Sequence, residues 1–277
     1  MRREAGRSTL QADDAGLEAS VLKSLSRLTH LDDPERVAFY GDLLKDERPP
    51  CAVAFDERHR RLLTMLAWGC GSGQAGDPSL DAYFHRLWRE GAVRSEVLEL
   101  LETLDRRSRT RATPSHLPPD IPLSLHARYS RAEIVAALGF GTGVKPKVTQ
   151  GGILWVPGVQ SDVFFVDLHK AERDYSPTTM YRDYAISPEL FHWESQSRQS
   201  PHQPTVQRYI EHRARGTRIL LFVRERKTFE LGTQPFTFLG PVTYVNHRGE
   251  RPVAFTWRLP TPMPEELFEI ARSVAAA

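Results

Sequence analysis

The sequence predicts an α+β protein, in which an all-helical N-terminal region precedes a curved mixed β-sheet or small β-barrel with one or two flanking helices. Three observations predict this fold. Apolar residues recur at three- and four-residue steps through the first part of the chain. A proline-rich stretch, Thr113–Asp120, then interrupts the helical pattern. Beyond it, segments rich in β-branched and aromatic residues alternate with turn residues, as in a sheet.

The first 112 residues are expected to contain no strand. Residues 1–16 mix charges with small residues and show no periodicity, so we expect a loose arm. Residues 17–112 should form a helical subdomain, because leucine and aromatic stripes at helical spacing are typical of a packed core. The expected helices begin near Leu17, Pro34, Asp56, Ser79 and Ser95.

Residues 121–277 should form a β-rich domain. Ser130 and Glu133 have the spacing of a capping box, which predicts a helix over Ser130–Leu138. Two more helices are expected at Thr205–Arg215 and from Pro264 to Val274. Strands are expected at Gly152–Val156, Asp162–Leu168, Leu190–Ser195, Arg218–Arg224, Phe236–Val245 and Val253–Leu259.

The composition, 40% hydrophobic and 26% charged over 277 residues, is that of a soluble globular protein. No apolar run has the length of a membrane span and no secretory leader pattern is visible, so we predict a cytoplasmic protein without a membrane partner. The net charge of +2 conceals an uneven distribution, since Arg198–Arg258 holds 11 Lys and Arg against 4 Asp and Glu. Such an excess indicates a polyanion-binding face, although a solvated basic surface has the same composition.

The motifs of several enzyme classes are broken or absent. Gly139–Lys145 lacks the Gly-Lys-Ser/Thr step of a phosphate loop. Asp167 and Lys170 are three residues apart, whereas side chains two apart on a strand would share the face that a metal-dependent nuclease needs. Cys51 and Cys70 do not have the spacing of a zinc site. We therefore expect no catalytic residue, metal or cofactor, and a cryptic nuclease that uses Asp167 is the less favoured alternative.

The stretch Phe191–Thr205 combines aromatic, amide, hydroxyl and basic side chains, a set that can stack on a base, bond its edge and neutralise a phosphate. We predict that Trp193 stacks on a base, and that Ser195 and Gln196 bond to its edge. An equally open interpretation is a strand that ends in a polar loop capping the next helix. Basic residues here, on the next helix and at a later hairpin tip should contact phosphates: Arg198, His202, Arg208, His247, Arg248 and Arg251.

A second polar stretch, Arg173–Tyr184, is rich in tyrosines and hydroxyls. We predict that its side chains line the same pocket. A loop made rigid by Ser-Pro and by threonine capping is an equally good interpretation of the same residues. The candidates from this stretch are Tyr175, Thr178, Thr179 and Tyr181.

Several stretches spread through the chain together carry a family resemblance. They are Leu31–Arg36, Leu125–Arg131, Tyr175–Tyr181, Leu190–Ser197, Arg208–Ile210 and Phe238–Val242. On these residues the chain resembles domain-of-unknown-function family 3427, the C-terminal accessory domain of bacterial superfamily 2 helicases and restriction-type defence proteins. The resemblance implies a helicase and a nuclease, encoded nearby, as protein partners.

The helicase and nuclease activities of those larger proteins do not carry over, because this chain has no Walker motif and no phospholipase-D-like His-x-Lys signature. By fold analogy alone, its curved sheet is similar to the PUA and SRA barrels, which read modified or flipped bases. We therefore predict a non-catalytic DNA-binding module that reads modified bases in a restriction or phage-defence system. The alternative is a protein-interaction domain that docks a helicase core.

Overall fold

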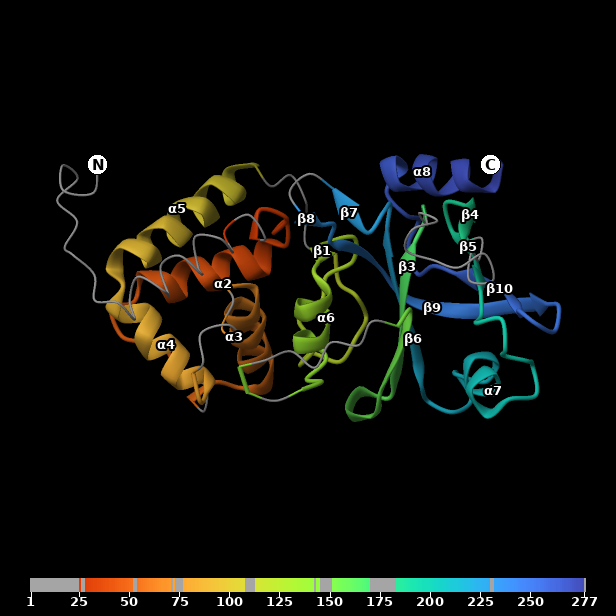
Figure 1. Cartoon of the computed structure of the whole chain (residues 1–277), viewed down its shortest axis with the longest axis horizontal. Coiled ribbons are helices and arrows are strands. Elements are labelled where there is room, and N and C mark those ends of the chain that lie inside the picture. Colours follow the sequence, from red (N-terminus) through yellow and green to blue (C-terminus); the bar gives the residue numbers. More distant parts are fainter. Residues whose placement is uncertain are drawn as a thin grey trace. The chain divides into compact units, whose positions relative to one another are not determined.

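The computed structural model describes residues 25, 28–51, 54–70, 72, 77–107, 113–141, 143–144, 151–169, 183–229 and 232–276. The chain divides into two compact units. Unit 1 comprises Met1–Ala112, Pro118–Leu123 and Ala127–Val148, and unit 2 comprises Thr113–Leu117, Ser124–His126 and Thr149–Ala277. The protein is α+β, as predicted, with a helical N-terminal region followed by a mixed β-sheet and flanking helices (Figure 1). No described helix is long and apolar enough to cross a membrane.

In the part of unit 1 that the structure describes, the regular elements are helices apart from the short strand β1 (Arg128–Tyr129). Helix α2 packs against α5, and α3 packs against α6. Aspartate or serine side chains cap α2, α3, α4 and α6, and the predicted capping box of α6 is confirmed. The arm over residues 1–16 and most of the helix expected from Leu17 lie outside the described residues. The helices are α2 (Pro34–Lys45), α3 (Glu57–Gly69), α4 (Leu80–Arg89), α5 (Gly91–Arg107) and α6 (Arg131–Ala137).

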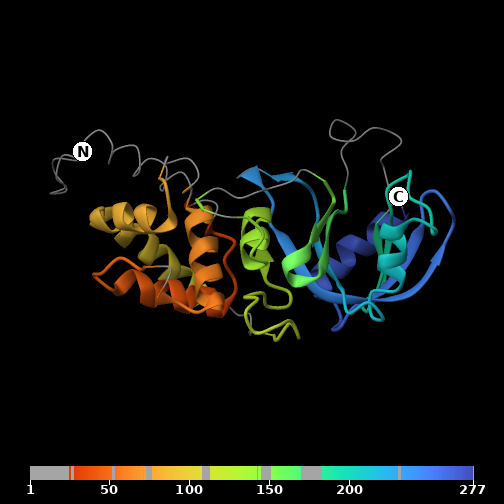
Figure 2. The same ribbon diagram turned by 90° about the horizontal axis from the view of Figure 1, so that it is seen from below.

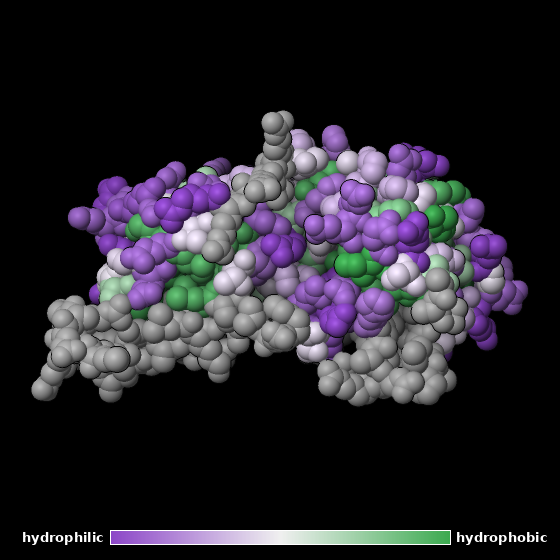
Figure 3. Space-filling view, turned by 90° about the horizontal axis from the view of Figure 1, so that it is seen from above, coloured by the Kyte–Doolittle hydropathy of each residue, from purple (hydrophilic) through white to green (hydrophobic). Residues whose placement is uncertain are grey.

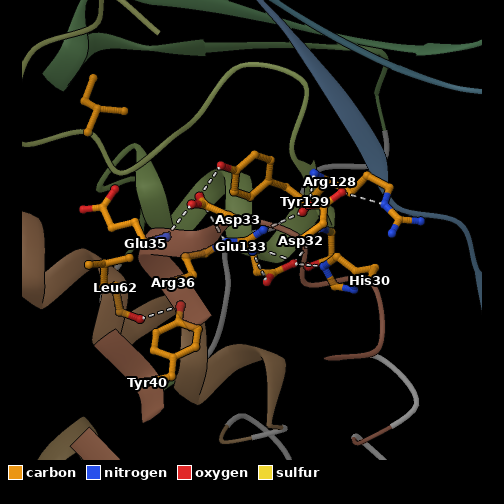
Figure 4. A network of polar contacts seen from close by, with 12 residues as sticks. His30, Asp32, Asp33, Glu35, Arg36, Tyr40, Leu62, Arg128, Tyr129 and Glu133 are labelled. Carbon is orange, nitrogen blue, oxygen red and sulfur yellow. Dashed lines mark hydrogen bonds and ion pairs between the residues drawn. The ribbon is translucent and has the colours of Figure 1, made fainter. Parts of the chain in front are cut away.

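A buried polar network joins α2 to the segment that carries α6 (Figure 4). The Arg36 guanidinium is fully buried and donates from Nη1 to Glu133 Oε1 at 2.8 Å and from Nη2 to the Arg128 carbonyl at 2.7 Å. The Tyr129 hydroxyl donates to Asp33 Oδ2 at 2.9 Å. Since every charge in this network has a counter-charge or a hydrogen bond, we interpret it as structural.

Glu133 is the carboxylate at the centre of this network. Burial alone would raise the pKa of Glu133, but the positive charges of His30 and Arg36 and hydrogen bonds from His30 and Ser130 outweigh burial and lower that pKa to about 2. His30 Nε2 lies 2.7 Å from Glu133 Oε2. The carboxylate therefore contributes to stability only while it is ionised.

Unit 2 is built on a sheet with the strand order β2-β3-β6-β9-β10-β5-β4. β3 and β6 are parallel, and the other neighbours along this path are antiparallel, so the sheet is mixed as predicted. A separate two-stranded sheet pairs β7 (Thr228–Phe229) with β8 (Gly232–Thr233). The strands of the main sheet are β2 (Ile153–Val156), β3 (Ser161–Asp167), β4 (Tyr184–Ser187), β5 (Leu190–Glu194), β6 (Arg218–Arg224), β9 (Phe236–Arg248) and β10 (Ala254–Arg258).

The small-barrel alternative is wrong, because the sheet is open. Its edge strands, β2 and β4, do not pair with each other. Instead α7 (Pro204–Ile210) and α8 (Glu265–Ala276) pack on one face and contribute Val206, Tyr209 and Ala271 to its core. Figure 2 shows both helices on the inner side of the curve that β9 follows. Two helices thus bury the apolar face that barrel closure would otherwise cover.

Several boundaries differ from the prediction. Helix α7 ends at Ile210 rather than Arg215, and turns follow it up to Gly216. β9 continues to Arg248, so the hairpin turn begins at Gly249, later than expected. Strand β4 was not predicted.

On the face that Figure 3 shows, hydrophilic residues prevail and hydrophobic ones form small separate patches.

Candidate nucleic-acid interface

Strands β5 and β10 have two chemically different faces. Phe191 and Trp193 of β5 pair with Trp257 and Phe255 of β10, and these four rings are buried in the core. The alternate residues must lie on the opposite face, because side chains of a strand alternate. On that face His192 is paired with Thr256 and Glu194 with Ala254. The register continues into β9, where Thr256 is paired with Asn246 and Ala254 with Arg248. We call the part of this surface formed by Tyr184, His192, Glu194, Thr256, Asn246 and Arg248 the polar face. Arg258 and Ser187, which are paired with Leu190 at the start of β5, lie outside it.

Hydrogen-bonding groups gather on the polar face. The Tyr184 and His192 rings stack with centroids 4.4 Å apart and planes at 23°. His192 Nε2 lies 3.7 Å from Glu194 Oε1, and the Glu194 amide donates to Asp183 Oδ1 at 3.0 Å. Burial lowers the pKa of His192 against the opposing effect of the Glu194 and Asp183 carboxylates, and Arg248 lowers it further. At neutral pH His192 is therefore an uncharged imidazole, which can both donate and accept a hydrogen bond.

Two segments meet where β5 and β10 reach the end of their pairing. The Ser195 amide donates to the Val253 carbonyl at 2.9 Å, and the Val253 amide donates to Ser195 Oγ at 3.0 Å. This contact places residues 195–203, which lead from β5 to α7, beside residues 248–253, which comprise the last residue of β9 and the tip of the β9–β10 hairpin. We call these two segments together the rim.

The rim carries exposed arginines. Arg198, Arg248 and Arg251 are all exposed, and none of them forms an ion pair with another residue that the structure describes. Arg248, the last residue of β9, also belongs to the polar face. Gln196 is exposed on the same rim, and so is the acidic Glu250. The predicted residues that the structure brings together are thus Gln196, Arg198, Arg248 and Arg251.

Trp193 does not belong to this surface. It is 5% exposed, and its ring stacks on Phe164 with centroids 4.1 Å apart and planes at 19°. Tyr209 and Phe255 pack against it at 6.0 and 5.7 Å. This burial contradicts the predicted base-stacking role, because the ring of a core residue is not accessible to a base.

Arg208 was predicted to contact phosphate, but it makes a bidentate ion pair inside unit 2. Its Nε and Nη2 donate to Asp162 Oδ2 and Oδ1 at 2.7 and 2.8 Å, and its guanidinium lies 4.3 Å from the Trp155 ring centroid. The Asp162 side chain is completely buried. Arg208 therefore neutralises a buried carboxylate and fixes α7 to the sheet, and a phosphate would have to compete with that carboxylate.

Of the other predicted residues, His202 is exposed on the rim, Ser195 and His247 have their side chains engaged inside unit 2, and four lie outside the described residues. Ser195 is fully buried, so its hydroxyl cannot reach the edge of a bound base. The half-buried His247 has its Nδ1 2.7 Å from the Tyr244 hydroxyl and packs on Phe255. His202 is exposed in the segment before α7. Tyr175, Thr178, Thr179 and Tyr181 lie outside the described residues.

The alternative of a nuclease centred on Asp167 finds no support in the described part of the chain. Asp167 and Arg224 are paired across the parallel strands β3 and β6, and Arg224 Nη2 donates to Asp167 Oδ2 at 3.3 Å. Among the described residues no group of three or more His, Cys, Asp or Glu side chains could hold a metal ion. Asp167 is thus part of a buried ion pair that connects two strands.

The sequence interpretation missed the polar face, although the signal was in its central stretch. In Phe191–Glu194 the order Phe-His-Trp-Glu alternates apolar and polar residues, which places His192 and Glu194 opposite Phe191 and Trp193. Applying that alternation to β5 would have assigned Trp193 to the core. Asp183 and Tyr184 end the polar stretch Arg173–Tyr184, but the sequence did not indicate the pairing of β4 with β5 that brings Tyr184 to His192.

The comparison with known families agrees with the resemblance noted in the sequence. The model of a family described as "Domain of unknown function (DUF3427)" matches residues 123–271, which is more than half of the 277 residues. The chain therefore belongs to this family. The match covers β1, α6 and the main sheet of unit 2, and it does not include Leu31–Arg36. Among curated proteins, none matches this chain.

Proposed function

We propose that this protein is a non-catalytic DNA-binding module whose rim contacts the phosphate backbone. The observation that carries the proposal is the convergence of Arg198, Arg248 and Arg251, exposed and without ion pairs to described residues, on two segments that the Ser195–Val253 contact holds together. Arginine binds phosphate through charge and through paired N–H donors. Three such side chains on two connected segments suit a polyanion better than a single small anion.

The polar face extends this proposal from phosphates to bases. The half-buried Tyr184 ring stacks on the buried His192, while Glu194, Thr256 and Asn246 offer hydrogen-bonding groups in one register beside Arg248. Base edges are recognised by such groups, and phosphate contacts position the nucleic acid for that recognition. We propose that Glu194 and Asn246, whose side chains are accessible on this face, take over the base-contacting role that the sequence assigned to Trp193. We also propose that the base contacted by the polar face is a modified one.

Partners are proposed from the resemblance alone. If the module acts beside a superfamily 2 helicase and a nuclease in a defence system, its DNA binding would direct those enzymes to their target. The competing proposal is a domain that only docks a helicase core, in which case the rim arginines are simply solvated. Binding to nucleic acid separates the two, because only the first proposal requires it.

The test is fluorescence anisotropy of the purified chain with plain, mismatched and modified duplexes, single-stranded DNA and RNA, each at two salt concentrations. The matched pair of variants is Arg248→Ala and Arg258→Ala. Both arginines are exposed, and they lie near opposite ends of the β9–β10 hairpin. We expect Arg248→Ala to weaken binding by roughly five- to tenfold, about 1 kcal/mol, and Arg258→Ala to leave it within about twofold. Equal effects of the two variants, or no binding to any of the probes, would rule out the proposed interface.

A further inference from the structure

Ser195 has an unusual position at the end of the β5–β10 ladder. β5 ends at Glu194, which is paired with Ala254. One residue later, the Ser195 amide donates to the Val253 carbonyl at 2.9 Å, as in a regular antiparallel ladder. The return bond differs, because the Val253 amide donates to the Ser195 side-chain hydroxyl at 3.0 Å instead of a main-chain carbonyl. A side chain therefore completes this last pair of the ladder.

This substitution of hydroxyl for carbonyl has a geometric consequence. In a regular hydrogen-bonded pair the carbonyl must point at the partner strand, which keeps the chain in the sheet. Because Ser195 Oγ accepts the hydrogen bond from the Val253 amide, the main chain after Ser195 can turn away from the sheet while both hydrogen bonds between Ser195 and Val253 are kept. The turn that follows is held by the Gln199 amide, which donates to the Gln196 carbonyl at 2.8 Å, and by Gln203 Nε2, which donates to the Arg198 carbonyl at 3.3 Å.

The same contact fixes the other half of the rim. Val253 is fully buried and directly precedes β10, and Arg251 lies two residues before it. On the other side of the tip, Arg248 is held by its pairing with Ala254. Arg198 and Arg251 are therefore connected through one buried side chain, Ser195, which is itself 0% exposed.

We propose that Ser195 is a positioning residue, which couples the segment that carries Arg198 to the hairpin tip that carries Arg251, so that both arginines bind one nucleic-acid backbone. This inference rests on the proposed DNA binding. It replaces the direct base contact predicted from the sequence, because a buried hydroxyl that accepts a main-chain amide acts on the ligand only through the segments it holds. Spacing between phosphates is fixed along a backbone, so two arginines held at a fixed separation bind it better than two independent ones.

The variant that tests this is Ser195→Ala, which removes the acceptor and leaves the Val253 amide buried without a partner. Ser187→Ala is the matched control: Ser187 ends β4 near the opposite end of β5, and its hydroxyl also accepts a main-chain amide, that of Glu189, at 3.3 Å. We expect Ser195→Ala to weaken duplex binding roughly tenfold and Ser187→Ala to leave it within about twofold. Hydrogen exchange at the Val253 amide should speed up only in Ser195→Ala.

A readout specific to positioning is the coupling between Arg198→Ala and Arg251→Ala. In the unmodified chain, we expect the double variant to lose roughly threefold less affinity than the product of the single losses, because each arginine depends on the other for its placement. In the Ser195→Ala background, the affinity loss of the double variant should equal the product of the two single losses. If Ser195→Ala does not fold, Ser195→Cys, which keeps the volume but offers a weak acceptor, takes its place.

The outcomes separate this inference from the function on which it rests. Absence of nucleic-acid binding by the unmodified chain would overturn both. Normal binding by the unmodified chain together with unchanged affinity in Ser195→Ala, or coupling that persists in that variant, would overturn the positioning role and leave DNA binding in place. A Val253 amide that exchanges freely in the unmodified chain would also contradict it.

Discussion

Arg208 and Arg248 come from the same basic segment, and the sequence assigned both to phosphate contact, yet the structure places them in opposite situations. Arg208 is bound to a fully buried Asp162 and lies over Trp155. Arg248 is exposed on the rim and forms no ion pair with a described residue. Local charge density along the sequence therefore does not identify a binding surface. An arginine is a candidate for ligand contact only if it does not already form an ion pair with an acidic residue of its own fold.

The largest expected effect in the interior comes from Trp193. Trp193→Ala would remove a ring that packs against Phe164, Tyr209 and Phe255, so we expect a loss of about 4 kcal/mol in the free energy of unfolding. Chemical denaturation measures this loss, with Trp193→Phe as a milder control. A well-folded Trp193→Ala protein that had lost only nucleic-acid binding would contradict the core role of Trp193 and restore its predicted base-stacking role.

Arg208 should be the next most costly position. Arg208→Ala leaves Asp162 buried without a counter-charge, and we expect a loss of about 3 kcal/mol in unfolding free energy, at the lower end for buried pairs because Arg208 is partly exposed. Arg248→Ala should change the same quantity by less than about 0.5 kcal/mol. Thermal and urea unfolding of the two variants side by side measure the contrast. Similar stability of both would mean that the Asp162–Arg208 pair does not form in solution.

Acid should also destabilise the interior of unit 1. The pKa of Glu133 is lowered from its ordinary value of 4.5 to about 2, so the folded state holds this proton less tightly than the unfolded state. The resulting stabilisation, up to roughly 3 kcal/mol, is complete above about pH 5.5 and is lost as the pH falls through 4.5 toward 2. Unfolding free energies between pH 7 and pH 3 measure this loss. In Glu133→Gln the unfolding free energy should depend less steeply on pH over that range. An equally steep pH dependence in the variant would mean that other groups cause the acid sensitivity.

The parts of the fold that depend on local signals could be predicted from the sequence. Asp33, Asp56, Ser79 and Ser130 cap the helices that their spacing indicated, because a cap and its helix are neighbours in the chain. Strand β4 was missed because four residues before a Ser-Pro step carry too little periodicity for recognition.

The partners of individual charges could not be predicted, because they depend on the fold rather than on sequence spacing. Asp162 is 46 residues from Arg208, and Asp167 is 57 residues from Arg224. The rim has the same origin, since the β9–β10 and β5–β10 registers align Arg248, Ala254 and Glu194 across three strands. What the sequence did contain was the alternation in β5, which separates a core face from the polar face.

The most direct test of the account is the salt dependence of duplex binding, measured for the unmodified chain and for a triple variant, Arg198→Ala/Arg248→Ala/Arg251→Ala. If each rim arginine contacts a phosphate, the slope of log K against log salt should become shallower by about 0.9 for each arginine removed, or roughly 2.7 in total. The Arg258→Ala control should keep the original slope. A triple variant whose slope equals that of the unmodified chain would show that the exposed arginines are only solvated and that the DNA-binding surface lies elsewhere.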